Sequence, residues 1–213
     1  MHNYQREFIN FSLHTGALQF GNYTLKSGRT SPYFFNTGLF ANGEAASKLG
    51  KFYADAIINS NLKFDMLFGP AYKGIPLVSL TAAALYEYHN INVPFTYNRK
   101  EIKDHGEGGN LVGPSLNGKV LIIDDVITAG TAIKEANKII TLSGAQNSGI
   151  VISIDREEKN NNLNSAKEEI EIQFQCSVIS IATITNIIEI LKEKPEHKSH
   201  LKLMINYRNT YGI

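Results

Sequence analysis

Two adjacent carboxylates stand at the centre of the segment of this chain that is best suited to chemistry. Asp124 and Asp125 follow the apolar run of residues 120–123 and precede a turn, residues 128–131, that is rich in Thr, Ala and Gly. Such a turn at the start of a helix offers backbone N–H groups, hydroxyls and the helix dipole to a phosphate dianion. The carboxylates cannot contact that phosphate, so we expect them to face vicinal ribose hydroxyls or hydrated Mg²⁺. A ribose 5-phosphate satisfies both halves of the segment.

A purely structural interpretation of the same segment is also open. Asp124 and Asp125 would then cap the turn, and Thr128 and Thr131 would cap the following helix. Two carboxylates at the end of an all-apolar strand carry a large desolvation cost, which capping alone explains poorly. We therefore favour the sugar phosphate interpretation.

A second candidate for anion binding is the segment Gly-Pro-Ala-Tyr-Lys-Gly at residues 69–74. Its two glycines would let the backbone approach a ligand closely, and Lys73 adds a cation beside it. We interpret the segment as a clamp for pyrophosphate. An ordinary strand-to-helix turn with a surface lysine is the alternative.

The third candidate, residues 99–109, concentrates positive charge and contains three glycines within four positions. This combination suits a lid that becomes ordered over a polyanion. Taken alone, the segment is more typical of a solvated charged loop. A phosphate cradle elsewhere in the chain favours the lid, because a pyrophosphate leaving group needs counter-charge. The cationic residues are Arg99, Lys100, Lys103 and His105.

The N-terminal part supplies a Lys-Ser-Gly turn at residues 26–28 and the run Ser-Pro-Tyr-Phe-Phe-Asn at residues 31–36. Phe34 and Phe35 are neighbours, so in a strand they point to opposite faces. We expect one of them to enter the core, while the other, or its backbone, lines a ligand pocket. A core role for both side chains is the alternative.

The elements that position these segments follow from hydrophobic spacing and turn residues. Residues 17–36 are typical of short strands and turns, and Gly16 should end the first helix. Runs of β-branched residues without alternation indicate parallel strands buried on both faces. Helices are predicted over about residues 4–13, 46–57, 75–88 and 131–143, and strands over residues 65–68, 93–97, 119–123, 149–154 and 178–182.

The predicted fold is an α/β fold, with an open, mainly parallel sheet flanked by helices. Ligands of such sheets bind beyond the carboxyl ends of the strands, where the three candidate segments fall. The 213 residues suit a single domain, which we divide into an N-terminal hood, about residues 1–40, and a core, about residues 41–213.

Composition narrows the class of protein. With 43% hydrophobic residues, 19% charged residues and a net charge of +1, a soluble globular protein is expected, with no nucleic-acid or membrane partner. The single cysteine, Cys176, allows no intrachain disulfide, and we interpret it as a small core residue. Neither a signal peptide nor a membrane span is apparent, so a cytoplasmic location is expected.

The order of motifs resembles a known family. Four apolar residues, Asp-Asp, an apolar pair and Thr-Ala-Gly-Thr resemble the 5-phosphoribosyl 1-pyrophosphate (PRPP) loop of the type I phosphoribosyltransferases. Together with the Lys-Ser-Gly turn, the Ser-Pro-Tyr-Phe-Phe run, the Tyr72-Lys73 pair and the lid, the chain resembles the orotate phosphoribosyltransferases along nearly its whole length. The lid is the part that best distinguishes the acceptor.

The resemblance implies a type I phosphoribosyltransferase fold and transfer of the ribosyl 5-phosphate group from PRPP to orotate, in the synthesis of UMP. It implies Mg²⁺ as cofactor, held mainly by PRPP and water near Asp124 and Asp125 and without direct protein ligands. It also implies a homodimer in which the lid reaches the partner's active site. Rival hypotheses are a transferase for a purine or uracil and a regulatory protein that binds PRPP without turnover.

The resemblance also assigns roles to residues. Arg156 follows a predicted strand, and its guanidinium could pair with the carboxylate of orotate, although a surface salt bridge to Glu157 or Glu158 is the alternative. The catalytic residues would be Lys103, Asp124, Asp125 and Arg99, with Lys103 nearest the departing oxygen. Orotate would contact Lys26, Phe34, Phe35, Thr128 and Arg156. PRPP would contact Lys26, Tyr72, Lys73, Arg99, Lys100, Lys103, His105, Asp124, Asp125, Val126, Ile127, Thr128, Ala129, Gly130, Thr131 and Ala132.

Overall fold

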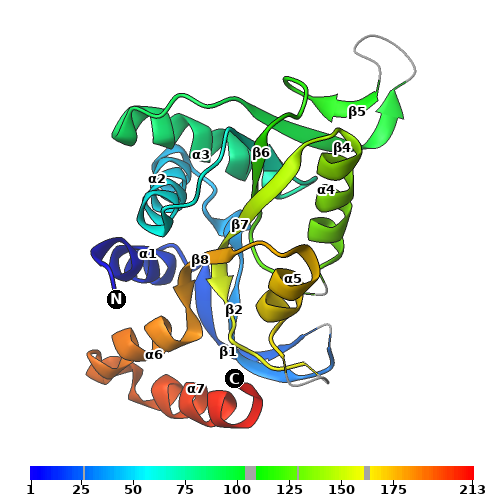
Figure 1. Ribbon diagram of the computed structural model, residues 1–213. Helices are drawn as coiled ribbons and strands as arrows, with labels where there is room; N and C mark the ends of the chain where they lie inside the picture. The colour runs from blue at the N-terminus through cyan, green and yellow to red at the C-terminus, as the bar shows by residue number, and fades with distance from the viewer. Residues whose placement is uncertain (26, 104–108, 129, 161–163) are drawn as a thin grey trace.

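A six-stranded sheet forms the centre of the molecule (Figure 1), in a computed structural model that describes residues 1–25, 27–103, 109–128, 130–160 and 164–213. The strand order is β5-β4-β3-β6-β7-β8, and only the β4–β5 pair is antiparallel. The strands are β3 (Met66–Gly69), β4 (Phe95–Lys103), β5 (Gly109–Val112), β6 (Lys119–Ile123), β7 (Gln146–Asp155) and β8 (Val178–Thr183).

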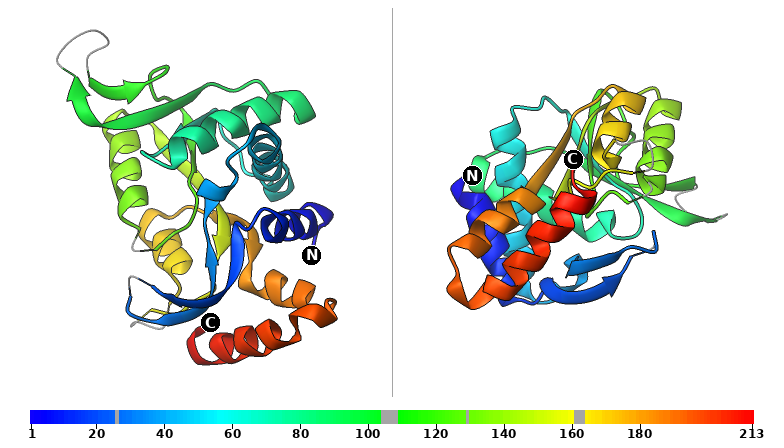
Figure 2. Two further views of the ribbon diagram at one scale, coloured as in Figure 1. Left: turned by 180° about the vertical axis from the view of Figure 1, so that it is seen from behind. Right: turned by 90° about the horizontal axis from the view of Figure 1, so that it is seen from below.

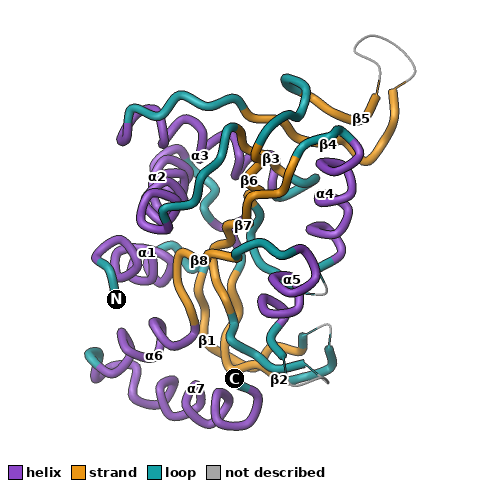
Figure 3. The backbone as a smooth tube through the Cα atoms, viewed as in Figure 1, coloured by secondary structure: helices purple, strands orange, loops and turns teal. Residues whose placement is uncertain are grey.

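Two groups of helices cover the two faces of this sheet (Figure 3). One face packs against α1 (Asn3–His14), α2 (Gly43–Ser60), α3 (Gly74–His89) and α6 (Ile184–Lys192), and the other packs against α4 (Thr131–Leu142) and α5 (Ala166–Phe174). In β6, Leu121 and Ile123 belong to the first cluster, whereas Val120 and Ile122 belong to the second. All four side chains are fully buried, which explains why the strand is a continuous apolar run.

A smaller antiparallel sheet, β1 (Leu18–Thr24) and β2 (Thr30–Phe35), forms the hood. Figure 2 shows it beside the last helix, α7 (Lys198–Tyr211), near the C-terminus. Phe8 of α1 packs against the rings of Phe35, Phe40 and Phe52, so hood and main sheet share one hydrophobic cluster. Two short 3₁₀ helices, Thr37–Leu39 and Pro195–His197, complete the described elements.

The predicted α/β fold is confirmed, with each expected helix and strand present within a few residues of its predicted bounds. The sequence reasoning missed β5, α5, α6 and α7. It also ended β4 at residue 97, whereas the strand continues to Lys103, so Arg99 and Lys100 lie on a strand rather than in a loop. The centre of the predicted lid, residues 104–108, lies outside the described residues.

Two smaller expectations concern the environment of the chain. Cys176 is partly buried against the cluster that contains α4 and α5, and burial raises the pKa of its thiol to about 11, which suits a packing residue. Among the described residues, no helix is long and apolar enough to cross a membrane.

Candidate active site

Parallel strands bring the candidate segments to one edge of the sheet. Residues 70–73 follow β3, Asp124 and Asp125 follow β6, and Arg156 follows β7, and these three strands run in the same direction. The residues that follow these strands therefore lie at the carboxyl edge of the sheet, where the sequence analysis expected the segments at 69–74 and 124–131.

The two carboxylates are buried, with 6% of Asp124 and 7% of Asp125 exposed. The backbone N–H of Asp125 donates to Oδ1 of Asp124 at 2.9 Å, and that of Val126 donates to Oδ1 of Asp125 at 2.8 Å. These bonds shape the turn, as the structural interpretation expects. They occupy only one oxygen of each carboxylate, so they do not account for the pair by themselves.

The second oxygen of Asp125 joins three parts of the chain. Lys73 Nζ lies 2.5 Å from Oδ2 of Asp125, and the hydroxyl of Thr37 donates to the same oxygen at 3.3 Å. Lys73 follows β3, and Thr37 lies just after β2, within the hood. Lys73 and Asp125 were both predicted site residues, and the structure brings them into contact. Thr37 was missed although it directly follows the predicted run at residues 31–36, because its contact with Asp125 arises only in the fold.

Asp124 has an unusual protonation equilibrium. Burial, with a further contribution from the charge of Asp125, raises its pKa to about 7. A carboxyl group in this state responds to any cation that approaches, because the cation favours the ionised form. Perturbed carboxyl groups of this kind are typical of functional sites.

A buried tyrosine supports the acidic turn from behind. The hydroxyl of Tyr53, on α2, donates to the backbone oxygen of Asp124 at 2.7 Å and lies 2.6 Å from Oγ of Ser153. The N–H of Ser153 in turn donates to the backbone oxygen of Asp125 at 2.8 Å. Sequence reasoning missed Tyr53 and Ser153, since each looks like an ordinary member of its element.

The turn after the carboxylates ends at Gly130, which has a φ of +71° and begins α4. A Cβ at this position would lie 3.0 Å from Ile170 Cδ1, so both the backbone conformation and the space favour glycine. Glycine offers no capping side chain, and the first turn of α4 carries no acidic residue. Thr128 is exposed beside this helix end. Thr131 and Ala132 form the first turn of α4, while Ala129 lies outside the described residues.

The structure explains the glycines at 69 and 74 by close packing rather than by the predicted approach of a ligand. A Cβ on Gly69 would lie 2.3 Å from the backbone oxygen of Gly74, and a Cβ on Gly74 would lie 2.9 Å from that of Ile123. Close packing of strand, turn and helix therefore requires them, whether or not a ligand approaches. The loop also contains a cis peptide bond between Ala71 and Tyr72.

Of the predicted cationic residues on β4, Lys100 lies beside this loop. Lys100 Nζ stands 5.3 Å from the ring centre of Tyr72, whose side chain is 64% exposed. Arg99 is partly buried. Neither the Lys103 side chain nor His105 falls within what the structure describes, so their predicted contacts stay predictions.

The adjacent phenylalanines of β2 point to opposite faces, which confirms that prediction. Phe35 is 9% exposed and packs in the core, whereas Phe34 is 41% exposed and stacks on Tyr23 at 5.3 Å. Phe35 can therefore offer a ligand only its backbone, and Phe34 is the side chain available at the surface. Lys26 lies outside the described residues.

Arg156 is drawn toward the hood. Its Nε donates to Oε1 of Glu158 at 2.8 Å, its Nη2 donates to Oγ of Ser31 at 3.0 Å, and the guanidinium lies 4.2 Å from the ring centre of Tyr33. The salt bridge to Glu158 that was the alternative for this residue is thus present. It is partly buried, and it connects β7 with β2.

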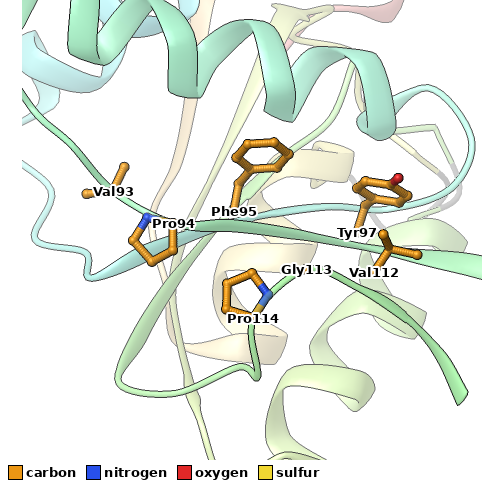
Figure 4. A pocket seen from close by; sticks show the side chains of 7 residues that line it. All are labelled: Val93, Pro94, Phe95, Tyr97, Val112, Gly113 and Pro114. Carbon is orange, nitrogen blue, oxygen red and sulfur yellow. The ribbon is translucent and has the colours of Figure 1, made fainter. Parts of the chain in front are cut away.

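A hollow of the described surface lies away from these residues. A depression of about 470 Å³ lies at the β4 edge of the sheet below α3 and is lined by apolar side chains (Figure 4). It contains none of the predicted site residues. The lining residues are Val93, Pro94, Phe95, Tyr97, Val112, Gly113 and Pro114.

Known proteins share this sequence and fold. A model of the phosphoribosyl transferase domain matches residues 38–183. The orotate phosphoribosyltransferase of Shigella flexneri is 53% identical over 213 residues, which is 100% of both chains. The crystal structure of orotate phosphoribosyltransferase from Francisella tularensis superposes with a TM-score of 0.87 at 42% identity, covering 97% of this chain and 100% of that one.

A more distant structure shares the fold alone. The Mycobacterium tuberculosis orotate phosphoribosyltransferase in complex with PRPP is 16% identical, with a TM-score of 0.62 over 86% of this chain and 98% of that one.

Proposed function

The chain belongs to the orotate phosphoribosyltransferase family, and we propose that it transfers the ribosyl 5-phosphate group of PRPP to a ring nitrogen of orotate. The products are orotidine 5′-phosphate and pyrophosphate, in the pathway to UMP. The observation that carries this function is the identity above one half with a family member along the whole of both chains. The convergence of Lys73, Asp124 and Asp125 at one edge of the sheet supports it.

In the reaction, the bond from the anomeric carbon to the pyrophosphate oxygen breaks and a bond to the orotate nitrogen forms. Positive charge develops on the ribose and negative charge on the leaving group. A protein assists such a step mainly by positioning the reactants and by stabilising these charges. Groups fixed before the substrates arrive are therefore more useful than mobile ones.

For the ribose, we assign Asp124 and Asp125 to the 2- and 3-hydroxyls, directly or through metal-bound water. Thr37 and Lys73 hold one oxygen of Asp125, which supports this role because it fixes the carboxylate plane. The 5-phosphate is assigned to the N-terminus of α4, where the helix dipole and the backbone N–H groups of the first turn suit a dianion. Its ligands would be Val126, Ile127, Thr128, Ala129, Gly130, Thr131 and Ala132.

For the pyrophosphate, we assign Lys73 and the cations of β4 and the lid. Lys73 reaches Asp125 in the present structure, so it would move from that partner, or be shared with it, when PRPP binds. Lys103 is the proposed partner of the departing oxygen. The remaining ligands would be Lys26, Tyr72, Arg99, Lys100 and His105.

Magnesium fits the chemistry of the acidic turn. Among the described residues, no three His, Cys, Asp or Glu side chains lie close enough to form a metal cage, so the ion would take most of its ligands from PRPP and water. Carboxylates such as Asp124 and Asp125 would hold its water ligands. When bound, Mg²⁺ neutralises charge on the pyrophosphate and so improves the leaving group.

For orotate, we assign Arg156 to the carboxylate, with Lys26, Phe34, Phe35 and Thr128 around the ring. Arg156 stands at the carboxyl end of β7 on the same edge as the acidic turn, which supports this assignment. Its partial burial beside Tyr33 strengthens a charge-assisted hydrogen bond.

We further propose that the protein is a homodimer that shares its lids and works in the cytoplasm. The β4–β5 pair extends from the body at the end opposite the hood (Figure 1), so this edge of the sheet is well placed to meet another chain. The apolar depression beside that pair supports docking of a second copy on this face. We retain one domain with a hood of about residues 1–40, because a single hydrophobic cluster joins Phe8 of the hood to Leu121 of the core.

The test is an absorbance assay of orotate consumption with PRPP, with and without Mg²⁺, beside uracil, hypoxanthine and adenine as acceptors. We expect orotate alone to be consumed, and only with the metal. Turnover of another base would contradict orotate as the acceptor but would still support PRPP as the donor. Binding of PRPP without turnover of any base would instead favour a regulatory protein.

A further inference from the structure

Arg156 does not stand alone at the end of β7. Glu158 accepts from its Nε at 2.8 Å and lies 2.6 Å from its Nη2, while Ser31 accepts from Nη2 at 3.0 Å. Ser31 is fully buried and its own hydroxyl donates to the backbone oxygen of Tyr33 at 2.7 Å. These contacts use the edge of the guanidinium that carries Nε and Nη2. The hydroxyl of Tyr207 is a further hydrogen-bond partner of Arg156.

Glu158 is itself held from two further directions. The hydroxyl of Tyr207, on α7, donates to Oε1 of Glu158 at 2.9 Å, and Nη1 of Arg29 lies 3.9 Å from Oε2. Arg29 also donates to the backbone oxygen of Lys159 at 2.9 Å and stacks over Tyr211 at 4.9 Å. One carboxylate therefore ties the hood, the end of β7 and the last helix together.

The C-terminal residues fix the backbone of the same segment. The N–H of Lys159 donates to the oxygen of Tyr211 at 2.8 Å, and the N–H of Ile213 donates to the oxygen of Glu157 at 3.0 Å. A strand-like bridge pairs Glu158 with Gly212 between these bonds. The position of Glu158 is thus set by the end of the chain as well as by its own side chain.

The group of Arg29, Arg156 and Glu158 has a net charge of one positive unit. Arg29 and Arg156 contribute two cations and Glu158 one anion, and all three side chains are less than one quarter exposed. Glu158 on its own would cancel the charge of Arg156 toward a ligand. Arg29 offsets that effect, so the group can orient the guanidinium and still attract a carboxylate.

We propose that Glu158, held by Tyr207 and Arg29, is a positioning residue that sets the direction in which Arg156 meets the acceptor's carboxylate. The proposal rests on the acceptor role given to Arg156 under the proposed function. It makes the last helix, α7, part of the device that selects a carboxylated pyrimidine over an uncharged one. A plain tether of the C-terminus would have the same contacts but no effect on acceptor affinity.

Tyr207→Phe tests the proposal without changing any charge. It removes the hydroxyl that donates to Glu158 and that also hydrogen-bonds with Arg156, and it keeps the ring that packs against Tyr33. We expect the KM for orotate to rise about 3- to 10-fold, on the scale of one ordinary hydrogen bond because the hydroxyl acts through Arg156, with kcat and the KM for PRPP unchanged. Tyr88→Phe, an exposed tyrosine of α3, is the matched control.

Glu158→Gln separates orientation from simple electrostatics. The substitution keeps the size of the side chain and makes the cluster more positive by one charge. Loss of orientation predicts a higher KM for orotate, whereas a purely electrostatic role predicts a lower one and would overturn the proposal. Unchanged KM values in both variants, with only a lower melting temperature, would reduce the cluster to a tether.

Arg156→Gln distinguishes failure of this inference from failure of the acceptor assignment. If Arg156→Gln weakens orotate binding while Tyr207→Phe and Glu158→Gln do not, only the positioning role is wrong. If Arg156→Gln leaves the KM for orotate unchanged, the acceptor role of Arg156 is wrong, and the inference is overturned with it. Orotate turnover by the native chain remains the separate test of the function.

Discussion

At the scale of single residues, Asp124 is a carboxyl group that is largely shielded from water. Its carboxyl is buried beside another carboxyl, and the bond from the Asp125 N–H only partly offsets the cost of its charge. The free protein therefore holds Asp124 close to half protonated at neutral pH. Binding of a cation or of ribose hydroxyls would favour the ionised form, which links ligand binding to proton release.

This leads to a prediction for the stability of Asp124→Asn without substrate or metal. The folded pKa of Asp124, about 7, lies above the ordinary value of 3.8, so the unfolded chain loses its proton first as the pH rises. The contribution of Asp124 to native stability is present in full at low pH and declines between about pH 4 and pH 7. Asparagine cannot ionise and avoids this decline.

Urea unfolding of both proteins from pH 4 to pH 8 measures the effect. We expect the free energy of unfolding of Asp124→Asn to increase relative to that of the native chain as the pH rises, by about 2–4 kcal/mol above pH 7. The KM for PRPP should rise in the same variant if the carboxylate holds a ribose hydroxyl. A stability difference that does not vary with pH would show that the Asp124 carboxyl has an ordinary pKa.

The residues of the acidic turn could be predicted because strand, charge and turn chemistry are adjacent in sequence. Thr37, Tyr53 and Glu158 could not, because their roles arise from distant elements that meet only in the fold. Thr37 is 88 positions from Asp125, and Tyr53 is 71 positions from Asp124. Short-range patterns carry no information about such pairs.

At the scale of elements, the strands of the sheet were the easiest to predict and the additions to it the hardest. The β6 run is apolar on both faces and could belong only to a covered strand. The outer part of β4 pairs with β5, a short strand at the edge of the sheet that begins with Gly109. This part of β4 is polar, so its composition resembles that of a loop.

The helices after residue 160 differ in how strongly the sequence signals them. A capping box at Thr183 and isoleucines at 184, 187 and 188 mark the start of α6, so this helix is predictable from the sequence. In α5, Ile172 is 70% exposed, and the apolar face is short. A capping box of Ser165 and Glu168 does mark the start of α5, but the helix buries only Ile170, so its pattern beyond the first turn is weak.

A prediction at this scale concerns the link between α2 and the acidic turn. Tyr53→Phe removes the hydroxyl that meets Asp124 and Ser153 and leaves their buried oxygens with one partner fewer. We expect a loss of about 1–3 kcal/mol in the free energy of unfolding and a higher KM for PRPP, since the turn loses its support. Tyr86→Phe, an exposed tyrosine of α3, should change neither quantity. Loss of stability with native PRPP kinetics would mean that Tyr53 serves folding alone.

At the scale of the whole molecule, the residues proposed for catalysis come from two parts of the fold. The acidic turn, Arg156 and the hood lie around one part of the sheet edge, whereas the β4–β5 pair leads away from the body (Figure 2). The proposed lid could serve its own chain or the second chain of the proposed dimer. The apolar depression supports the association that the second arrangement needs.

Mixed dimers decide between these two arrangements. Lys103→Ala removes the proposed lid cation and should lower kcat roughly 100-fold, while Asp125→Asn disables the acidic turn that Lys73 contacts. If lids act on the partner's site, each hybrid dimer of the two variants contains one site with a native lid and a native turn. Mixing the inactive proteins should then restore up to about one quarter of the native activity, because half of the dimers are hybrids with one good site of two. Absence of recovery, after subunit exchange has been verified by mass spectrometry, would show that each lid closes over its own chain.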